Sequence, residues 1–345
     1  MSKIAFVGNF QYNCGSSNTL LGYVKAASKL GHEVRVSEFG YIDETIRKTI
    51  PVANRDWEAD LLVIVYESYP FLSEADIDEI IKKVPRSKIV LLDPDGKYLE
   101  PITSGKDTNH PTADSYKFWT TLYDSLSDII LQPFLGTSSN PKIHSFLYFG
   151  VDRQASEVRS TQKEFDLLYV GNNWYRWHDI TWLVNAVKPI RSELKRVALI
   201  GQYWTGEPME GFEEATESDE TFLTANNVEV YKSADYGEVE SAMSRGKLHP
   251  ILVRPILNEM KFVTPRMFET FRADTVPLIP YYFTHANSLY GADVSKLTIS
   301  NDATKDISRI LNDYQASEKL SRDIREKLLD EHSYEVRLGQ LLEYV

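Results

Sequence analysis

Short apolar runs alternate with amphipathic stretches along the first 150 residues. The apolar runs have the length and the unbroken hydrophobicity of buried parallel strands, at 4–7, 33–36, 61–65, 89–92 and 128–131. Apolar residues at helical spacing predict one helix that Gly31 closes and a second helix over 73–84. Strands that alternate with helices indicate a parallel α/β sheet, so a complete doubly wound domain is expected by residue 150.

The same alternation restarts after a polar segment, 151–164, that is typical of a linker. Further strands are predicted at 165–170, 197–200, 227–231, 251–253 and 276–279. Helices are predicted up to Ala186, over 265–272 and from about 304 to 345. Both halves begin with a strand, a Gly/Asn loop and a helix. The chain is therefore predicted to form two Rossmann-like doubly wound α/β domains facing a cleft.

Composition narrows the class of protein. The 345 residues are enough for two domains at roughly 150 residues each, and 42% hydrophobic with 26% charged residues is ordinary for a globular chain. The net charge is −12 and neither half is basic, which disfavours nucleic acid as a partner, although Lys82, Lys83, Arg86 and Lys88 form one local basic cluster. A single cysteine excludes an intramolecular disulfide. With no signal peptide and no long apolar stretch, we expect a cytoplasmic protein without a membrane span.

Two Gly/Asn loops follow the first strand of each predicted domain, at 8–10 and 171–173. Backbone N–H groups in such a loop can receive an anion or a sugar hydroxyl, and the alternative is a tight strand-to-helix turn. Neither loop has the G-x-G-x-x-G spacing of a nicotinamide site. The candidate residues of the first loop are Gly8, Asn9, Tyr12, Asn13 and Gly15.

The segment 262–280 carries the strongest pattern of candidate binding residues. Thr264 is predicted to cap a helix, and the helix presents Arg266, Glu269 and Arg272 at three-residue spacing. A carboxylate there can accept bonds from vicinal hydroxyls, while Arg266 and the helix start can hold phosphate. The alternative is an exposed face of salt bridges. The seven histidines lack the spacing of metal ligands, so no metal site is expected.

With these segments in place, the chain resembles GT-B glycosyltransferases, in particular the CgeB-like branch of the group-1 glycosyltransferases. The resemblance lies in GNFQYNCGSSNTLLGYVKAASKLGHEVRV, YFGVDRQ, FDLLYVGNN, TPRMFETFRADTVPLIP and HSYEVRLGQLLEYV. It implies an acceptor-side domain at 1–152, a nucleotide-sugar-binding domain at 153–322 and a terminal helix at 323–345 that crosses back to the first domain. It also implies a nucleotide diphosphate sugar as donor, with neither a cofactor nor a catalytic metal.

The resemblance assigns the donor residues one by one. Glu269 matches the family's ribose-binding carboxylate, and the loop near the diphosphate is matched by Gly171 and Asn172. The remaining donor-site candidates are taken from their places in the sequence: Asn173, Thr264, Arg266, Arg176 and His178. For Arg176 the alternative is a solvated helix residue. Many relatives carry a second Glu eight positions before the ribose-binding one, where this chain has Lys261.

Glycosyl transfer needs a stabilised leaving diphosphate and, in an inverting enzyme, a base for the acceptor proton. Glu67, Asp93 and Asp95 follow predicted strands of the first domain and are the candidate bases. Asp-Pro-Asp-Gly is also a turn signal, so a structural role is the alternative for both aspartates.

The chain is thus predicted to transfer a hexose or a pentose from a nucleotide sugar to an acceptor hydroxyl. The acceptor stays open among a glycan, a small molecule, a protein and a hydroxylated base in DNA, as in phage enzymes of this fold. A sugar-nucleotide epimerase and a catalytically silent nucleotide-sugar-binding module are alternative functions for the same fold.

Overall fold

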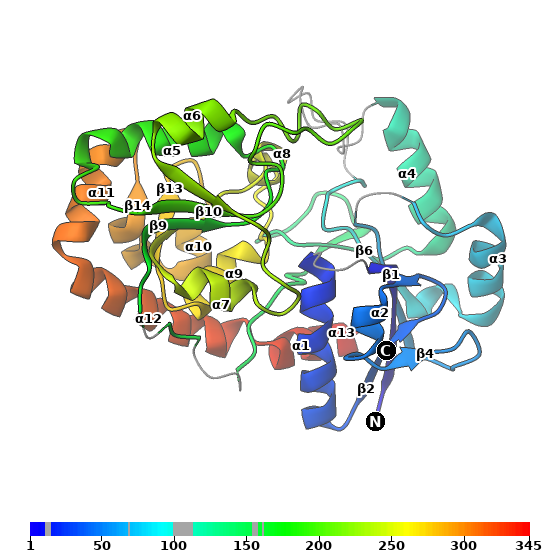
Figure 1. The fold of residues 1–345 in the computed structure, drawn as a ribbon. Coiled ribbons are helices and arrows are strands. Elements are labelled where there is room, and N and C mark those ends of the chain that lie inside the picture. The colour runs from blue at the N-terminus through cyan, green and yellow to red at the C-terminus, as the bar shows by residue number, and fades with distance from the viewer. Residues whose placement is uncertain (11–14, 68–69, 99–112, 154–157, 161) are drawn as a thin grey trace. The chain divides into compact units, whose positions relative to one another are not determined.

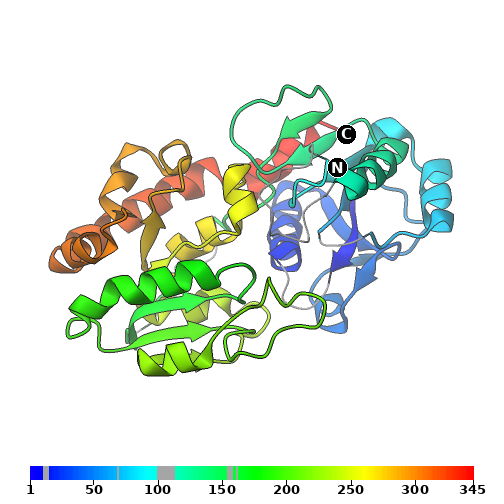
Figure 2. The same cartoon turned by 90° about the horizontal axis from the view of Figure 1, so that it is seen from above.

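The computed structural model describes residues 1–10, 15–67, 70–98, 113–153, 158–160 and 162–345. The chain divides into two compact units, each a parallel sheet flanked by helices (Figure 1, Figure 2). The first unit holds the described residues up to Arg153 together with Glu331–Val345, and the second holds those from 158 to Asp330.

The sheet of the first unit has the strand order β4-β2-β1-β5-β6-β7-β8, with β3 paired to β1, and all of these pairs are parallel. Its strands are β1 (Lys3–Phe10), β2 (Glu33–Ser37), β3 (Tyr41–Ile42), β4 (Val52–Ala53), β5 (Leu61–Val65), β6 (Ile89–Leu92), β7 (Ile130–Gln132) and β8 (Ile143–Ser145). Every residue of the central strands β5 and β6 is buried, because helices cover both sheet faces. Full burial of each such aliphatic side chain contributes about 1.5–3 kcal/mol.

Strand β1 is longer than predicted. Its residues Gly8, Asn9 and Phe10 continue the strand, so the prediction of a loop at 8–10 is wrong. Pairing extends the strand, because Gly8 lies beside Val65 of β5, and Asn9 and Phe10 lie beside β3. A Cβ on Gly8 would lie 2.6 Å from the Phe10 ring, so this glycine serves close packing. Tyr12 and Asn13 lie outside the described residues.

Helix α13 packs against α1 within the first unit. The ring of Tyr334 lies so close to Gly22 that a Cβ there would come within 2.2 Å of it. Lys29 of α1 pairs with Glu335 at 2.8 Å. The helices of this unit are α1 (Gly15–Leu30), α2 (Glu44–Arg47), α3 (Glu74–Lys83), α4 (Ala113–Leu126) and α13 (Tyr334–Leu342), with a 3-10 turn at Arg86–Lys88. Gly15, a candidate of the predicted loop, is the first residue of α1.

The second unit has a parallel sheet of order β11-β10-β9-β12-β13-β14. Its strands are β9 (Phe165–Val170), β10 (Val197–Ile200), β11 (Val228–Tyr231), β12 (Gly246–Pro250), β13 (Val276–Pro280) and β14 (Thr298–Ile299). Its helices are α5 (Trp177–Val187), α6 (Glu220–Ala225), α7 (Val239–Ser244), α8 (Pro255–Glu259), α9 (Arg266–Arg272), α10 (Ala286–Tyr290), α11 (Ala303–Asn312) and α12 (Tyr314–Glu331), with 3-10 turns at Lys188–Ile190 and Ala292–Leu297.

The prediction of a strand at 251–253 is wrong, because the strand at this place is β12 and ends at Pro250. Its residues, GKLHP, lack an apolar run, and they form a strand because Gly246 and Leu248 pair with β9 while Leu248 also pairs with β13. Central position in the sheet thus overrides the local composition.

Candidate functional site

The glycine loop of the second unit lies at the carboxyl end of β9. Gly171 accepts a hydrogen bond at its carbonyl from Trp204 Nε1 at 2.9 Å. A Cβ on Gly171 would lie 2.8 Å from the Tyr169 hydroxyl and 3.3 Å from the Arg266 guanidinium. The position therefore needs glycine, and the loop brings backbone close to an arginine side chain.

The side chains of Asn172 and Asn173 fix the loops around the glycine. Asn172 Oδ1 accepts from the backbone N–H of Gln202 at 2.9 Å, which joins the loops after β9 and β10. Asn173 is fully buried, and its amide donates to the carbonyls of Tyr203 at 3.1 Å and Glu217 at 2.6 Å. Both side-chain amides thus hold the protein's own backbone.

Three arginines form a cluster at this edge of the sheet: Arg176, Arg254 and Arg266, named here the arginine cluster. Burial lowers the pKa of the Arg176 guanidinium, and the charges of Arg266 and Arg254 lower it further. Arg176 Nη1 donates to the Trp174 carbonyl at 2.7 Å, whereas its buried Nε has no hydrogen-bond partner among the described residues. The charges of Arg254 and Arg266 thus repel that of Arg176, and a bound anion would relieve this repulsion.

Arg254 was not among the predicted site residues. It follows the apolar run 251–253 and precedes Pro255, the first residue of α8, and it is 8% exposed. An arginine between an apolar run and a helix-starting proline is the signal that could have identified it, because strand ends of a parallel sheet carry ligand sites.

Glu269 and Arg266 lie one turn apart on α9. Arg266 Nη1 is 3.2 Å from Glu269 Oε2, and both side chains are mostly buried at 20% and 18% exposure. The alternative interpretation, an exposed face of salt bridges, therefore does not describe this pair, because both of its side chains are mostly buried. The prediction that Thr264 caps the helix is wrong, because α9 begins at Arg266 after Pro265 and has no side-chain cap.

His249 of β12 supports the same loop and was not predicted. Its Nε2 accepts from the backbone N–H of Val170 at 3.1 Å, directly before the glycine loop. Its Nδ1 lies 3.5 Å from Thr270 Oγ1, which donates to the Arg266 carbonyl at 2.8 Å. Burial and the nearby Arg266 charge hold the pKa of His249 well below its usual range, so the ring is neutral.

His178 lies in the first turn of α5 with its side chain 94% exposed, 3.5 Å from Asp179 Oδ1. Asp179 itself faces inward and accepts from the Tyr282 hydroxyl at 2.7 Å. Burial raises the pKa of the Asp179 carboxyl, which Tyr282 and His178 partly oppose. Asp179, rather than His178, is therefore the side chain beside the arginine cluster.

In the first unit, Asp93 is fully buried at the end of β6. Its two oxygens accept from the backbone N–H groups of Lys97 and Tyr98, both at 2.9 Å, and from the side chains of Tyr123 at 3.2 Å and Gln132 at 2.9 Å. These four bonds favour the structural alternative for Asp93, that of a turn residue.

Glu67, Asp95 and Lys97 form a second cluster at the carboxyl ends of β5 and β6, named here the Lys97 cluster. Lys97 Nζ donates to Asp95 Oδ2 at 2.8 Å. Glu67 Oε2 accepts from the backbone N–H of Ser16, in the first turn of α1, at 3.4 Å. Burial and the Asp95 charge raise the pKa of Glu67, which Ser16 and Lys97 partly oppose. The structure thus brings two of the three candidate bases together around one cation.

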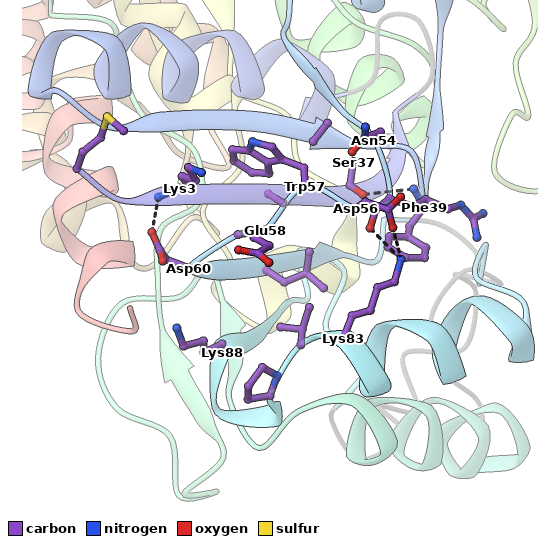
Figure 3. A pocket seen from close by; sticks show the side chains of 18 residues that line it. Lys3, Ser37, Phe39, Asn54, Asp56, Trp57, Glu58, Asp60, Lys83 and Lys88 are labelled. Atoms are coloured by element: carbon purple, nitrogen blue, oxygen red, sulfur yellow. Dashed lines mark hydrogen bonds and ion pairs between the residues drawn. The ribbon is translucent and has the colours of Figure 1, made fainter.

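A cavity of about 810 Å³ opens in the first unit beside the amino ends of β1 and β5 (Figure 3). Trp57 lies along this cavity with the Arg35 guanidinium 5.0 Å from its ring centre, and Lys83 Nζ reaches Asp56 at 2.8 Å. Ligands of parallel α/β sheets bind at the opposite edge, outside the carboxyl ends of the strands. None of the predicted site residues that the structure describes lines this cavity.

Over the described ranges, no three His, Cys, Asp or Glu side chains gather in a way that could hold a metal ion. Similarly, none of the helices that the structure describes has the length and apolar character to cross a membrane.

Comparison with known proteins decides the family. The profile of the family described as glycosyl transferase-like matches residues 163–343, more than half of the chain. The chain belongs to the glycosyl transferase-like family. A search of curated proteins found no match to the sequence of this chain.

Solved structures that resemble this glycosyltransferase cover nearly all of it. A mutant of BGT from T4 phage in complex with UDP-glucose is 16% identical over 99% of both chains, with a TM-score of 0.62. HepE from Anabaena in complex with UDP-glucose is 11% identical over 99% of both chains, with a TM-score of 0.65. An α-glucosyltransferase in complex with UDP-glucose and DNA containing an abasic site is 13% identical over 99% of both chains, with a TM-score of 0.61.

At these identities the likeness shows the fold. The predicted GT-B fold of two parallel-sheet α/β domains is confirmed, and the family confirms the prediction of a glycosyltransferase.

Proposed function

We propose that this glycosyltransferase uses a UDP-sugar as donor and binds its diphosphate through the arginine cluster. The observation that carries the proposal is the arginine cluster, in which the buried Arg176 Nε has no hydrogen-bond partner among the described residues and the charges of Arg254 and Arg266 act on the Arg176 guanidinium. Guanidinium groups hold phosphate by charge-assisted, bidentate hydrogen bonds. The structural neighbours named above bind UDP-glucose, so a hexose is the favoured sugar.

Glu269 is proposed to accept hydrogen bonds from the two ribose hydroxyls of the donor. Its partner Arg266 holds the carboxylate at 3.2 Å and reaches the Gly171 loop as well. Arg266 would thereby orient the ribose-binding carboxylate of Glu269 and also contact the phosphate. This assignment follows the CgeB-like branch that the sequence resembles.

The transfer itself would proceed as a displacement at the anomeric carbon. The acceptor oxygen forms a bond to that carbon while the bond from the carbon to the β-phosphate oxygen breaks, and the electron pair stays on the diphosphate. The arginine cluster stabilises the charge that develops there. In an inverting reaction the acceptor proton passes to a carboxylate of the first unit, for which Asp95 and Glu67 are the proposed candidates.

Calorimetry with UDP tests the donor site. Glu269→Gln should weaken UDP binding by about 1.5–3 kcal/mol, or roughly 10- to 150-fold in Kd, because charge-assisted hydrogen bonds to the ribose are lost. The affinity should persist in the presence of EDTA, since arginines supply the positive charge. Neither Glu269→Gln nor EDTA removes an apolar side chain from the hydrophobic core, so the protein should stay folded.

Glu259→Gln is the matched control, because Glu259 is an exposed carboxylate at the end of α8 in the same unit. It should leave UDP binding unchanged. Equal affinities for Glu269→Gln and the wild-type protein would remove the ribose assignment. UDP binding that vanishes in EDTA and returns with Mn²⁺ would contradict the metal-free donor site.

A further inference from the structure

Lys97 is an unusual side chain for a turn after a strand. It is fully buried, and its ammonium group donates to Asp95 Oδ2 at 2.8 Å and to the Tyr66 carbonyl at 3.1 Å. The same group lies 5.2 Å from the ring centre of Trp119 on α4. A buried ammonium loses its hydration, so it persists only where such partners replace water.

The turn does not need this cation. Asp93 fixes the turn, because it accepts the backbone N–H groups of Lys97 and Tyr98. The ammonium is directed instead to Asp95, whose side chain is 11% exposed while that of Lys97 is fully buried. The cation therefore lies behind a carboxylate that reaches the surface.

Glu67 completes the arrangement from the neighbouring strand. Its carboxylate faces the backbone N–H of Ser16 on α1 and the charges of both Asp95 and Lys97. Tyr123 of α4 directs its hydroxyl to Asp93 at 3.2 Å. Within the described part of the chain, the charged groups around Lys97 are thus two carboxylates at one sheet edge, with a third carboxylate already committed to the turn.

We propose that Lys97 is a positioning residue that holds Asp95 in place as an ionised carboxylate, so that a proton bound by the resting Asp95 and Glu67 pair as the pH falls is carried by Glu67. The proposal rests on the proposed function, in which one of these carboxylates accepts the acceptor proton. It divides the work between the two candidates: Asp95 receives the acceptor proton during transfer, whereas Glu67 carries a proton that the resting pair binds in acid.

Carboxyl carbon NMR of the full chain, labelled at Asp and Glu, tests the proposal without any acceptor. In the wild-type protein the Asp95 signal should stay that of a carboxylate from pH 8 to pH 5, while Glu67 titrates above the ordinary 4.5. Lys97→Met should raise the Asp95 midpoint by roughly 1–3 pH units, because its countercharge is gone. Lys82→Met removes an exposed lysine of α3 and should leave both midpoints unchanged.

A double variant covers the case in which Lys97→Met fails to fold. Lys97→Met with Asp95→Asn removes the uncompensated carboxylate as well, and the Glu67 midpoint should then fall, because the Asp95 charge raises it by more than the Lys97 charge lowers it. An unchanged Asp95 midpoint in the single variant, or an unchanged Glu67 midpoint in the double variant, would overturn the proposal.

Release of UDP from UDP-glucose, with water as the acceptor, then links the pair to turnover. The acid limb of the pH profile of this UDP release should shift to higher pH in Lys97→Met and should stay at the wild-type pH in Lys82→Met. A wild-type protein that binds no UDP in the calorimeter would refute the proposed function, whereas the NMR midpoints report on Lys97 independently of that result.

Discussion

His249 connects the proposed donor site to the stability of the second unit. It is fully buried, and one ring nitrogen accepts the backbone N–H of Val170. The neutral ring is therefore part of the folded structure around Gly171. A protonated ring would lose this acceptor and would face Arg266, whose charge already lowers its pKa.

Acid should destabilise the protein through this residue. The unfolded chain takes up the proton near the usual pKa of 6.5, whereas the folded chain takes it up only well below that pH. Between these two values the unfolded state binds more protons, so stability falls as the pH falls, by up to about 1.4 kcal/mol per pH unit. Urea unfolding at pH 7.5, 6.5 and 5.5 measures this slope, and His249→Gln should reduce it to the part that comes from His285, whose pKa burial lowers to about 4.

His178→Gln removes an exposed imidazole of the same unit and should keep the wild-type slope. A His249→Gln variant with the full acid slope would show that other groups cause it.

Single residues were predictable where spacing along the chain carries the signal. Arg266 and Glu269 could be identified because three-residue spacing places them on one helix face. Lys97 and His249 could not, because neither residue type indicates burial. Their roles depend on partners from other strands, such as Tyr66 and Val170.

At the scale of elements, the contact between α1 and α13 depends on a glycine. Gly22→Ala should destabilise the first unit by about 1–3 kcal/mol, because the added methyl group overlaps the Tyr334 ring. Gly339→Ala, on α13 itself, has open space around the added atom and should stabilise the helix by about 0.5–1 kcal/mol. Urea unfolding gives both values, and hydrogen exchange of α1 and α13 amides locates the effect.

The opposite order of stabilities, with Gly22→Ala above Gly339→Ala, would mean that α13 does not require this close approach.

Two central strands of the first unit were predictable to the residue. Strands β5 and β6 begin and end where their runs do, because both faces of a central parallel strand are buried. Strand β12 was displaced in the prediction since GKLHP contains glycine, proline and two polar residues. The two-residue strands β3 and β4 carry too few side chains for any periodicity.

At the scale of the whole molecule, the net charge of −12 bears on the acceptor. One structural neighbour is an α-glucosyltransferase in complex with DNA. We expect this chain to bind a labelled duplex DNA more weakly than about 10⁻⁴ M at 150 mM salt, because an acidic protein gains little from counterion release. Fluorescence anisotropy measures the affinity. Micromolar binding at that salt concentration would favour a base in DNA among the acceptors left open.

Because Glu331–Val345 belong to the first unit, the second unit is inserted within the first along the chain. This order matters while the protein is being made. At about 5–20 residues per second, the ribosome completes β1 to β8 many seconds before it produces Tyr334. Until then the surface of α1 around Gly22 stays uncovered, although every strand of the first unit has already been made. Nascent chains should therefore acquire a protease-resistant first unit only after α13 is made, and the waiting first unit should be a client of chaperones during synthesis.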